Sequence, residues 1–409
     1  MNAKELTEQA LQSIVKDGKV TANYNWQSSN SDTSFIWTFY FLGLTDLYVA
    51  TKDERLLKVC NDSVDWLFST ADSNLANNLQ ADVIVSWGPK QVKKMGLNGG
   101  KNYEVAPSDK VNPGWSRFID VGNGKMGFRP EILASGVIGY AVACYIRDAG
   151  DAIDSGKRQG WLKHLAEIFK YHSPNWRDME DHSAGATLSG GPYEKLPVSA
   201  YFWPNDKAGG IWQTSPGLNQ MSQFLSMGVI VEQLLGEDIG AMDKAKKFCQ
   251  NTIPHLIRED GDCMVTAYDL RDHSKMSETM AEPVNDSTHS QHSMPLFDIG
   301  PDYGLLPVEY QDKLMNQIKK HTSLGGGRMG VLMDGSTKHG GSNGPKYHPG
   351  IAHIADCLFF VNGADLLPLA KEVLAYDEKH HGMDTYSHKG FHYHARICLL
   401  YTSPSPRDS

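Results

Sequence analysis

The strongest constraint on the fold is a recurring pair of helical segments, the first apolar on every side and the second apolar on one side only. Residues 35–50 (FIWTFYFLGLTDLYVA) are apolar almost all round, which is typical of a buried helix. Residues 53–68 follow with a single apolar stripe, as in a helix that has one face on a core and the other in water. Such a pair predicts a helical hairpin with an inner and an outer helix.

The same pairing returns along the chain. The further pairs are 131–146 with 161–171, 218–235 with 242–257 and 351–361 with 366–374, and 308–319 is another outer-type helix. The spacing between pairs is irregular, which excludes a short solenoid repeat. We therefore expect an all-α fold, an (α/α) toroid or barrel of helical hairpins in which a ring of inner helices is surrounded by a ring of outer helices.

Long segments rich in Gly, Pro and Asn precede several inner helices, whereas most links from an inner to an outer helix are short. These long segments include 122–130 (GNGKMGFRP), 209–217 (GGIWQTSPG) and 340–350 (GGSNGPKYHPG). Long loops on one face of a rigid scaffold are where binding and catalytic residues concentrate. Residues 75–125 are polar and turn-rich, and we expect them to form an excursion over the cleft. Strands are expected only at 81–87 and 330–333.

The whole of 1–397 is predicted to be one catalytic domain. Residues 398–409 (CLLYTSPSPRDS) resemble the translated end of a sequencing adapter, so we expect them to be a non-native tail. The opening residues contain no apolar signal core, so the protein is expected to be cytoplasmic, or secreted or periplasmic if the natural N-terminus lies further upstream.

Composition excludes several classes of function. The net charge is −9 and no run of five basic residues occurs, which argues against a nucleic-acid partner. The six cysteines are far apart and form no CxxC pair, so neither a zinc finger nor a structural disulfide is implied. We find no stretch of 18 apolar residues, so no membrane span is expected. Phosphate-loop, GxSxG and dinucleotide-binding motifs are also absent from the sequence.

Polar residues on the long loops are the candidate site. Asn219 and Gln220 occupy the first turn of an otherwise apolar helix, where an amide and the helix dipole together suit a carboxylate. The alternative for Asn219 is a hydrogen bond to a neighbouring loop. Arg117 and Arg129 have the planar fork that matches carboxylates, and Trp212 is suited to stacking on a sugar ring. Trp115 and Trp203 in the same loops are likewise suited to stacking on sugars, and Arg177 and Arg328 are further candidate substrate contacts.

A histidine-rich stretch supplies candidate proton-transfer groups. Asp286 and His289 are three residues apart, so they can meet on one helical face, where the carboxylate orients the imidazole and raises its pKa. His292 follows on the same stretch. Tyr347 and His348 precede the 351–361 helix, and a tyrosine can donate or accept a proton if cations stabilise the phenolate. A third ligand with clear spacing is missing from the sequence, so we do not expect a metal site.

The order of these motifs resembles that of alginate-lyase-type and related uronate polysaccharide lyases, which have an α/α-toroid fold. The motifs are WSRF at 115–118, RPEILASGVIGYAVACYIRD at 129–148, SPGLNQMSQFLSMGVIVEQL at 215–234 and NDSTHS at 285–290. The resemblance implies β-elimination on an anionic polysaccharide or oligosaccharide of the alginate or glucuronan type, a reaction that needs no organic cofactor. It implies that Asn219 neutralises the uronate carboxylate, that His289 or Tyr347 is the base, that Tyr347 is the acid, and that Asp286 orients His289.

Two other functions stay open at this stage. A glycoside hydrolase on a similar barrel needs two opposed carboxylates, for which Glu131, Asp181, Glu194 and Asp286 are available, and a sugar epimerase would use paired histidines as bases. A non-catalytic carbohydrate-binding toroid would keep the tryptophans without turnover.

Overall fold

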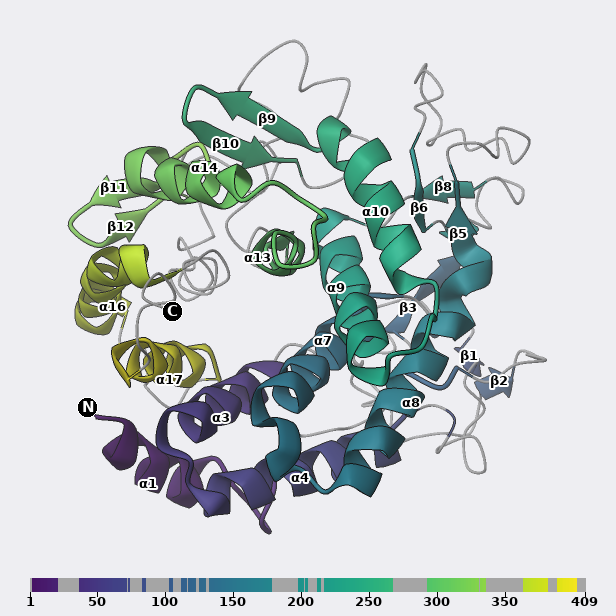
Figure 1. Cartoon of the computed structure of the whole chain (residues 1–409), viewed down its shortest axis with the longest axis horizontal. Helices are drawn as coiled ribbons and strands as arrows, with labels where there is room; N and C mark the ends of the chain where they lie inside the picture. The colour runs from purple at the N-terminus through teal and green to yellow at the C-terminus, as the bar shows by residue number, and fades with distance from the viewer. Residues whose placement is uncertain are drawn as a thin grey trace.

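The protein is mostly helical, as the sequence predicts for an all-α class (Figure 1). In the computed structural model, the described residues are 2–20, 37–71, 73, 83–85, 103–105, 112–115, 117–122, 125–129, 132–178, 198–201, 203–204, 212–214, 217–267, 293–330, 332–335, 363–381 and 388–402. Elements carry the labels of Figure 1.

Three of the predicted helical hairpins are confirmed. They are α3 (Thr38–Thr51) with α4 (Glu54–Ser69), α7 (Ile132–Ala149) with α8 (Ser155–His172), and α9 (Leu218–Leu235) with α10 (Ala241–Asn251). The first member of each pair is buried along most of its length, and the second is buried on one face only. Burial thus follows the two hydrophobic patterns that define the hairpins in the sequence.

The helices lie in two curved rows (Figure 1). The inner row runs through α17 (His388–Thr402), α3, α7, α9 and α13 (Pro295–Ile299), each packed on the next. The outer helices α4, α8 and α10 cover α3, α7 and α9. The remaining described α-helices are α1 (Ala3–Ser13), α14 (Glu309–Gln317) and α16 (Leu367–His381).

Helices α7 and α9 run in the same direction and approach closely through glycines. A Cβ on Gly136 would lie 3.1 Å from the backbone nitrogen of Phe224, and a Cβ on Gly139 would meet Met227. The second contact is three residues further along both helices than the first. The N-terminal ends of α7 and α9 therefore lie at the same end of the pair, and the segments that precede the two helices meet there.

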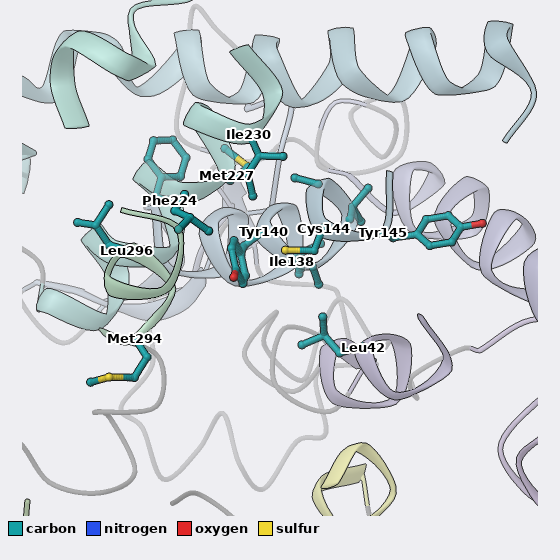
Figure 2. Close-up of a cluster of buried hydrophobic side chains, with 14 of the residues drawn as sticks. Leu42, Ile138, Tyr140, Cys144, Tyr145, Phe224, Met227, Ile230, Met294 and Leu296 are labelled. Atoms are coloured by element: carbon teal, nitrogen blue, oxygen red, sulfur yellow. The ribbon is translucent and has the colours of Figure 1, made fainter. Parts of the chain in front are cut away.

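The core fills the space between the inner helices. Figure 2 shows side chains from four helices gathered in one cluster, with Leu42 on α3, Ile138 and Cys144 on α7, Met227 on α9 and Leu296 on α13. All five are buried. A single apolar cluster of this kind holds the hairpins together, because each inner helix buries nearly its whole circumference.

Helix α7 also meets the length and hydropathy criteria of a membrane-spanning helix, which the sequence analysis missed. Among the described residues, the stretch Ile132–Ala152 is the one that is long and apolar enough to cross a membrane by length and composition. That corrects our statement that no such stretch exists. Within the structure 89% of the window is buried, as in the central helix of a packed core.

The turn-rich region at 75–125 contains more regular structure than expected. A four-stranded antiparallel sheet has the order β2-β1-β4-β3, formed by β1 (Val83–Val85), β2 (Tyr103–Val105), β3 (Arg117–Gly122) and β4 (Lys125–Arg129). The strand predicted at 81–87 is confirmed as β1. The other three strands went unpredicted: β2 depends on its pairing with β1, and β3 and β4 form a hairpin in a stretch that the sequence analysis took for a loop.

Small hairpins account for the remaining strands. They are β5 (Trp176–Arg177) with β6 (Ala200–Tyr201), β7 (Trp203–Pro204) with β8 (Trp212–Thr214), β9 (Ile257–Asp260) with β10 (Cys263–Thr266), and β11 (Ser323–Gly325) with β12 (Arg328–Met329). The structure does not form the strand predicted at 330–333 over its described residues: β12 ends at Met329, Leu332 forms a single bridge, and residue 331 lies outside the described residues. Three successive glycines at positive φ, Gly325 to Gly327, make the tight turn between β11 and β12. The hairpin therefore lies earlier in the chain than the predicted strand.

Two helix predictions also need correction. The helix expected at 242–257 ends at Asn251, and a 3₁₀ turn with Pro254 follows, because proline lacks the N–H that a continuing α-helix requires. Helix α17 was not anticipated, although it packs along α3 in the inner row. The helix predicted at 351–361 lies outside the described residues.

Five of the six cysteines lie in the described part of the chain, and all five are free and buried. Burial raises the pKa of the Cys144 thiol to about 11, so this thiol stays protonated at neutral pH. The described cysteines are therefore core residues, as predicted.

Candidate functional site

The predicted site residues fall into three groups in the structure. Asn219 and Gln220 lie in the first turn of α9, and their side chains are described. Arg117 begins β3, Arg129 ends β4 and Trp212 begins β8, so the backbone places these three. The other predicted site residues lie outside the described residues, and these are Asp286, His289, His292, Tyr347 and His348.

Asn219 is buried without a partner for its carbonyl oxygen. Its side chain is 2% exposed, and Oδ1 accepts no hydrogen bond from any residue that the structure describes. Our alternative interpretation gave Asn219 a structural hydrogen bond to a neighbouring loop, and within the described residues Oδ1 makes none. Burying an amide group without a hydrogen bond costs roughly 1–3 kcal/mol in folded proteins. Gln220, one residue on, is only partly buried.

The N-terminal end of α9 is suited to an anion. Its N-cap is Gly217, which has no side chain to accept the first N–H groups, and its first turn contains no acidic residue. An uncapped N-terminus on an 18-residue helix keeps the positive end of the dipole available to a ligand.

Inner and outer helices differ in how their N-termini are neutralised. The outer helices α4 and α8 begin with Asp53 and Asp154, whose carboxylates accept backbone N–H bonds of the first turn, and α10 has Asp243 there. The inner helices α3, α7 and α9 have no acidic residue in the first turn, and the N-caps of α3 and α9 are Trp37 and Gly217. The residue before α7 is Glu131, which lies outside the described residues. Because α7 and α9 are parallel, the positive ends of their two dipoles lie at the same end of the pair.

Strand pairing brings the two predicted arginines together. Arg117 of β3 and Arg129 of β4 are direct register partners in the antiparallel sheet. Residues opposite each other in such a pair share one face of the sheet, and two like charges there destabilise it unless a counter-charge is present. Arg129 also lies only three residues before α7 begins at Ile132. The arginine pair therefore adjoins the end of the molecule at which α7 and α9 begin.

Trp115 is a buried residue that holds the start of β3 against α7, and it is not a sugar-stacking residue. It is fully buried, and its indole Nε1 donates to the Thr70 hydroxyl at 3.3 Å. Its backbone N–H donates to the hydroxyl of Ser135 in the first turn of α7, also at 3.3 Å. The buried ring corrects our suggestion that Trp115 contacts substrate, and the Ser135 bond holds the start of β3 against α7.

Trp203, Trp212 and Arg328 lie on two other hairpins, β7–β8 and β11–β12. Trp203 and Trp212 lie on the β7–β8 hairpin, where Trp203 pairs with Thr214 and Trp212 with Pro204. Arg328 bonds the carbonyl oxygens of Leu324 and Gly325 in its own turn. Arg328 is therefore a residue that fixes a loop.

Ser222 joins α9 to the segment that follows the histidine-rich stretch, and the sequence analysis missed it. Its hydroxyl donates to the carbonyl oxygen of Ser293 at 2.7 Å and accepts from the backbone N–H of Leu296 at 2.8 Å. Ser293 is the residue after His292 in the chain. A buried serine three residues after Asn219 on the same helix was the signal that would have found this contact.

A second polar cluster lies inside the inner row, away from any predicted residue. Asp46 on α3 is 3.2 Å from Nε of Arg396 and 3.6 Å from Nε2 of His392, both on α17. Burial raises the pKa of Asp298 on α13 to about 7, with Arg396 and Arg147 acting in the opposite direction. Asp46, His392 and Arg396 link α3 to α17, the first and the last of the described inner helices along the chain.

The described residues contain no group of three His, Cys, Asp or Glu side chains arranged to hold a metal ion. No family model, no curated protein and no solved structure matches the chain.

Proposed function

We propose that the protein is a polysaccharide lyase that cleaves a uronate-containing polysaccharide or oligosaccharide by β-elimination. The observation that carries the proposal is Asn219, a buried amide whose oxygen has no partner among the described residues, at the uncapped start of α9. A polar group that the fold buries without a partner is a candidate for contact with a ligand. The proposed ligand is a uronate sugar: its carboxylate would accept from the Asn219 amide N–H groups and be neutralised with the help of the helix dipole, and one of its hydroxyl groups would donate to Oδ1.

Two further features support an anionic substrate. Arg117 and Arg129 occupy paired positions of the sheet, and Arg129 lies three residues before α7, although the net charge of the whole chain is −9. Arginine forks bind carboxylates in a bidentate manner. A polymer that carries one carboxylate on each sugar would meet the arginine pair and the α9 terminus with different sugar units.

In the proposed reaction, neutralising the carboxylate makes the proton on C5 of the uronate acidic. A base, His289 or Tyr347, removes that proton, and the electron pair forms a double bond between C4 and C5. The bond between C4 and the glycosidic oxygen breaks, and the oxygen takes a proton from Tyr347. Asp286 would orient His289. The Ser222 bonds support this set of residues, because they tie residues 293–296, which follow the 285–292 stretch in the chain, to the helix that carries Asn219.

We also propose that the two helix rows close into an (α/α) toroid. The inner row α17, α3, α7, α9 and α13 has a helix from the end of the chain packed beside one from its beginning. The apolar helix predicted at 351–361 would complete the inner ring between α13 and α17. Long segments precede α7 and α9 at their shared end, which is where loops that hold a polymer would lie.

The decisive test is the ultraviolet absorbance of the conjugated unsaturated uronate, with purified protein on alginate, glucuronan and other polyuronates. We expect absorbance to rise with wild type, and kcat to fall about 100-fold in Asn219→Ala, the usual loss when one donor to a developing oxyanion is removed. Asn219→Ala should fold with about the stability of wild type, because the buried Oδ1 that it removes makes no hydrogen bond to a described residue. Gln233→Ala, an exposed amide at the other end of α9, is the matched control and should keep full activity.

A loss of stability in Asn219→Ala, with activity unchanged, would make Asn219 a structural residue and remove the main support for the proposal. New reducing ends without the unsaturated chromophore would instead indicate hydrolysis. Binding of uronate oligosaccharides without any product would indicate a carbohydrate-binding protein.

A further inference from the structure

We propose that the buried ion pair between Asp46 on α3 and Arg396 on α17 is a latch that docks the last described inner helix onto the first. Oδ2 of Asp46 lies 3.2 Å from Nε of Arg396 and 3.6 Å from Nε2 of His392. Asp46 and His392 are buried, and the Arg396 side chain is 22% exposed. The latch does not depend on a catalytic role for the protein.

The contact between α3 and α17 around this pair is tight and mainly apolar. A Cβ on Gly43 would lie 2.7 Å from a ring carbon of Phe391 and 3.1 Å from the Cα of His392, so the two helices approach closely there. Asp46 is the one charged residue in the whole of α3. A charge buried in such a contact is strongly destabilising unless a counter-charge lies opposite it. Asp46 therefore needs Arg396 in place when α17 is docked.

The pair also selects one register of α17 along α3. Gly43 meets Phe391 and His392, whereas Asp46, less than one turn later on α3, meets Arg396, about one turn later on α17. The two helices therefore run in the same direction, side by side (Figure 1). A shift of α17 by one turn would keep apolar contacts but would separate Arg396 from Asp46 and leave both charges without their partner. Fixing the register of a helix is the best-attested role of a buried polar pair.

Helix α17 depends on this contact more than the other inner helices depend on any single neighbour. It packs mainly on α3 and to a smaller extent on α1, and it comes from the opposite end of the chain, so docking it carries a loop-closure cost. Asp298 on α13 also attracts Arg396, but less strongly than Asp46 does. By contrast, α7 and α9 pack on each other and on their own outer helices. We therefore expect α17 to undock as a unit when the pair is broken, while α7 and α9 stay folded.

The experiment measures amide hydrogen exchange in the full chain carrying Asp46→Asn, which removes the charge with little change of shape. We expect exchange of peptides covering 388–402 to rise about 100-fold, the lower end of the effect of breaking a buried pair, and exchange in α7 and α9 to stay at the wild-type level. Thr45→Val is the matched control. Thr45 is the buried neighbour of Asp46, but its hydroxyl donates to Phe41 O at 3.0 Å within α3 and contacts Cys60 on α4, so the 388–402 peptides should exchange as in wild type.

A double variant decides the question even if Asp46→Asn fails to fold. Asp46→Leu together with Arg396→Met removes both charges at once, and replacing a buried pair by apolar residues of similar volume usually costs little, so exchange at 388–402 should return close to the wild-type level. Exchange as fast in the double variant as in Asp46→Asn would show that packing and not the charge pair holds α17. Unchanged exchange at 388–402 in Asp46→Asn, or an equal rise in α7 and α9, would also overturn the latch.

Discussion

The packing of α9 against its outer helices can be tested at a single glycine. Gly228 lies where α8 and α10 both press on α9. A Cβ at Gly228 would lie 2.4 Å from Cε2 of Phe169 and 2.8 Å from Cβ of Ala241. Phe169 is fully buried and stacked on Phe224 with a centroid separation of 5.1 Å, and the Cβ of Ala241 moves only with the α10 backbone. Neither neighbour has open space to retreat into.

Two opposing effects determine the size of the change in Gly228→Ala. Alanine gains up to about 1 kcal/mol over glycine in a helix interior. Forcing an extra methyl group into a packed core costs about 1–3 kcal/mol, and we expect the upper end because contacts on two sides are too short. The net loss is about 2 kcal/mol in the free energy of unfolding. For a chain of this length, that lowers Tm by about 2–3 °C.

The measurement is thermal and urea-induced unfolding, compared with Gly160→Ala. Gly160 is an exposed position inside α8, and a Cβ there would meet no atom within 4 Å. The control therefore receives the helix-propensity gain without the packing cost, and its stability should rise by up to about 1 kcal/mol. If Gly228→Ala were as stable as Gly160→Ala, the close packing of α8, α9 and α10 would be refuted.

Two buried titratable groups predict opposite pH dependences. Burial raises the pKa of Asp298 to about 7, so the folded state holds an extra proton between about pH 4 and 7 and stability falls as pH rises through that window. The free energy of unfolding of Asp298→Asn, measured by urea titration, should match that of wild type below pH 4. At pH 8 it should exceed that of wild type by about 2 kcal/mol, a figure reduced to allow for the partial exposure of Asp298. A constant difference between the two proteins at all pH values would contradict this. Burial lowers the pKa of His172 to about 3, so wild type should lose about 2 kcal/mol as pH falls from 6.5 to 5, while His172→Gln should show no such fall. Equal slopes in the two proteins over that pH range would show that His172 is not the source.

Hydrophobic patterns made the helical hairpins predictable. An inner helix such as α3 is apolar on all sides because it is buried all round, and an outer helix has one apolar stripe because it is buried on one face. Each pattern can therefore be recognised in the local sequence. Helices α3, α7 and α9 are examples, and their predicted limits differ from the observed ones by a few residues at most. Helix α17 escaped prediction because its apolar residues alternate with histidines, and its burial comes from packing on α3.

The sheet at 83–129 shows where local patterns fail. Strands β1 and β2 are three residues long, and their stability comes from partners distant in the sequence. The apolar run of β1 was predicted, but β2 is too short to show a period of two, so only its pairing reveals it. The same limit applies to Trp115, whose position in a loop motif suggested a ligand contact and whose burial reveals an anchor.

The sequence by itself determined the helical class, the inner and outer helices, and the exceptional position of Asn219 in an apolar helix, because these depend on neighbours within a turn or two. Only the tertiary structure decided which distant residues act together. It made Arg117 and Arg129 register partners, it set α7 and α9 parallel, and it tied Ser222 to Ser293. Those contacts depend on strand pairing and helix packing across the whole fold, and no stretch of sequence contains that information locally.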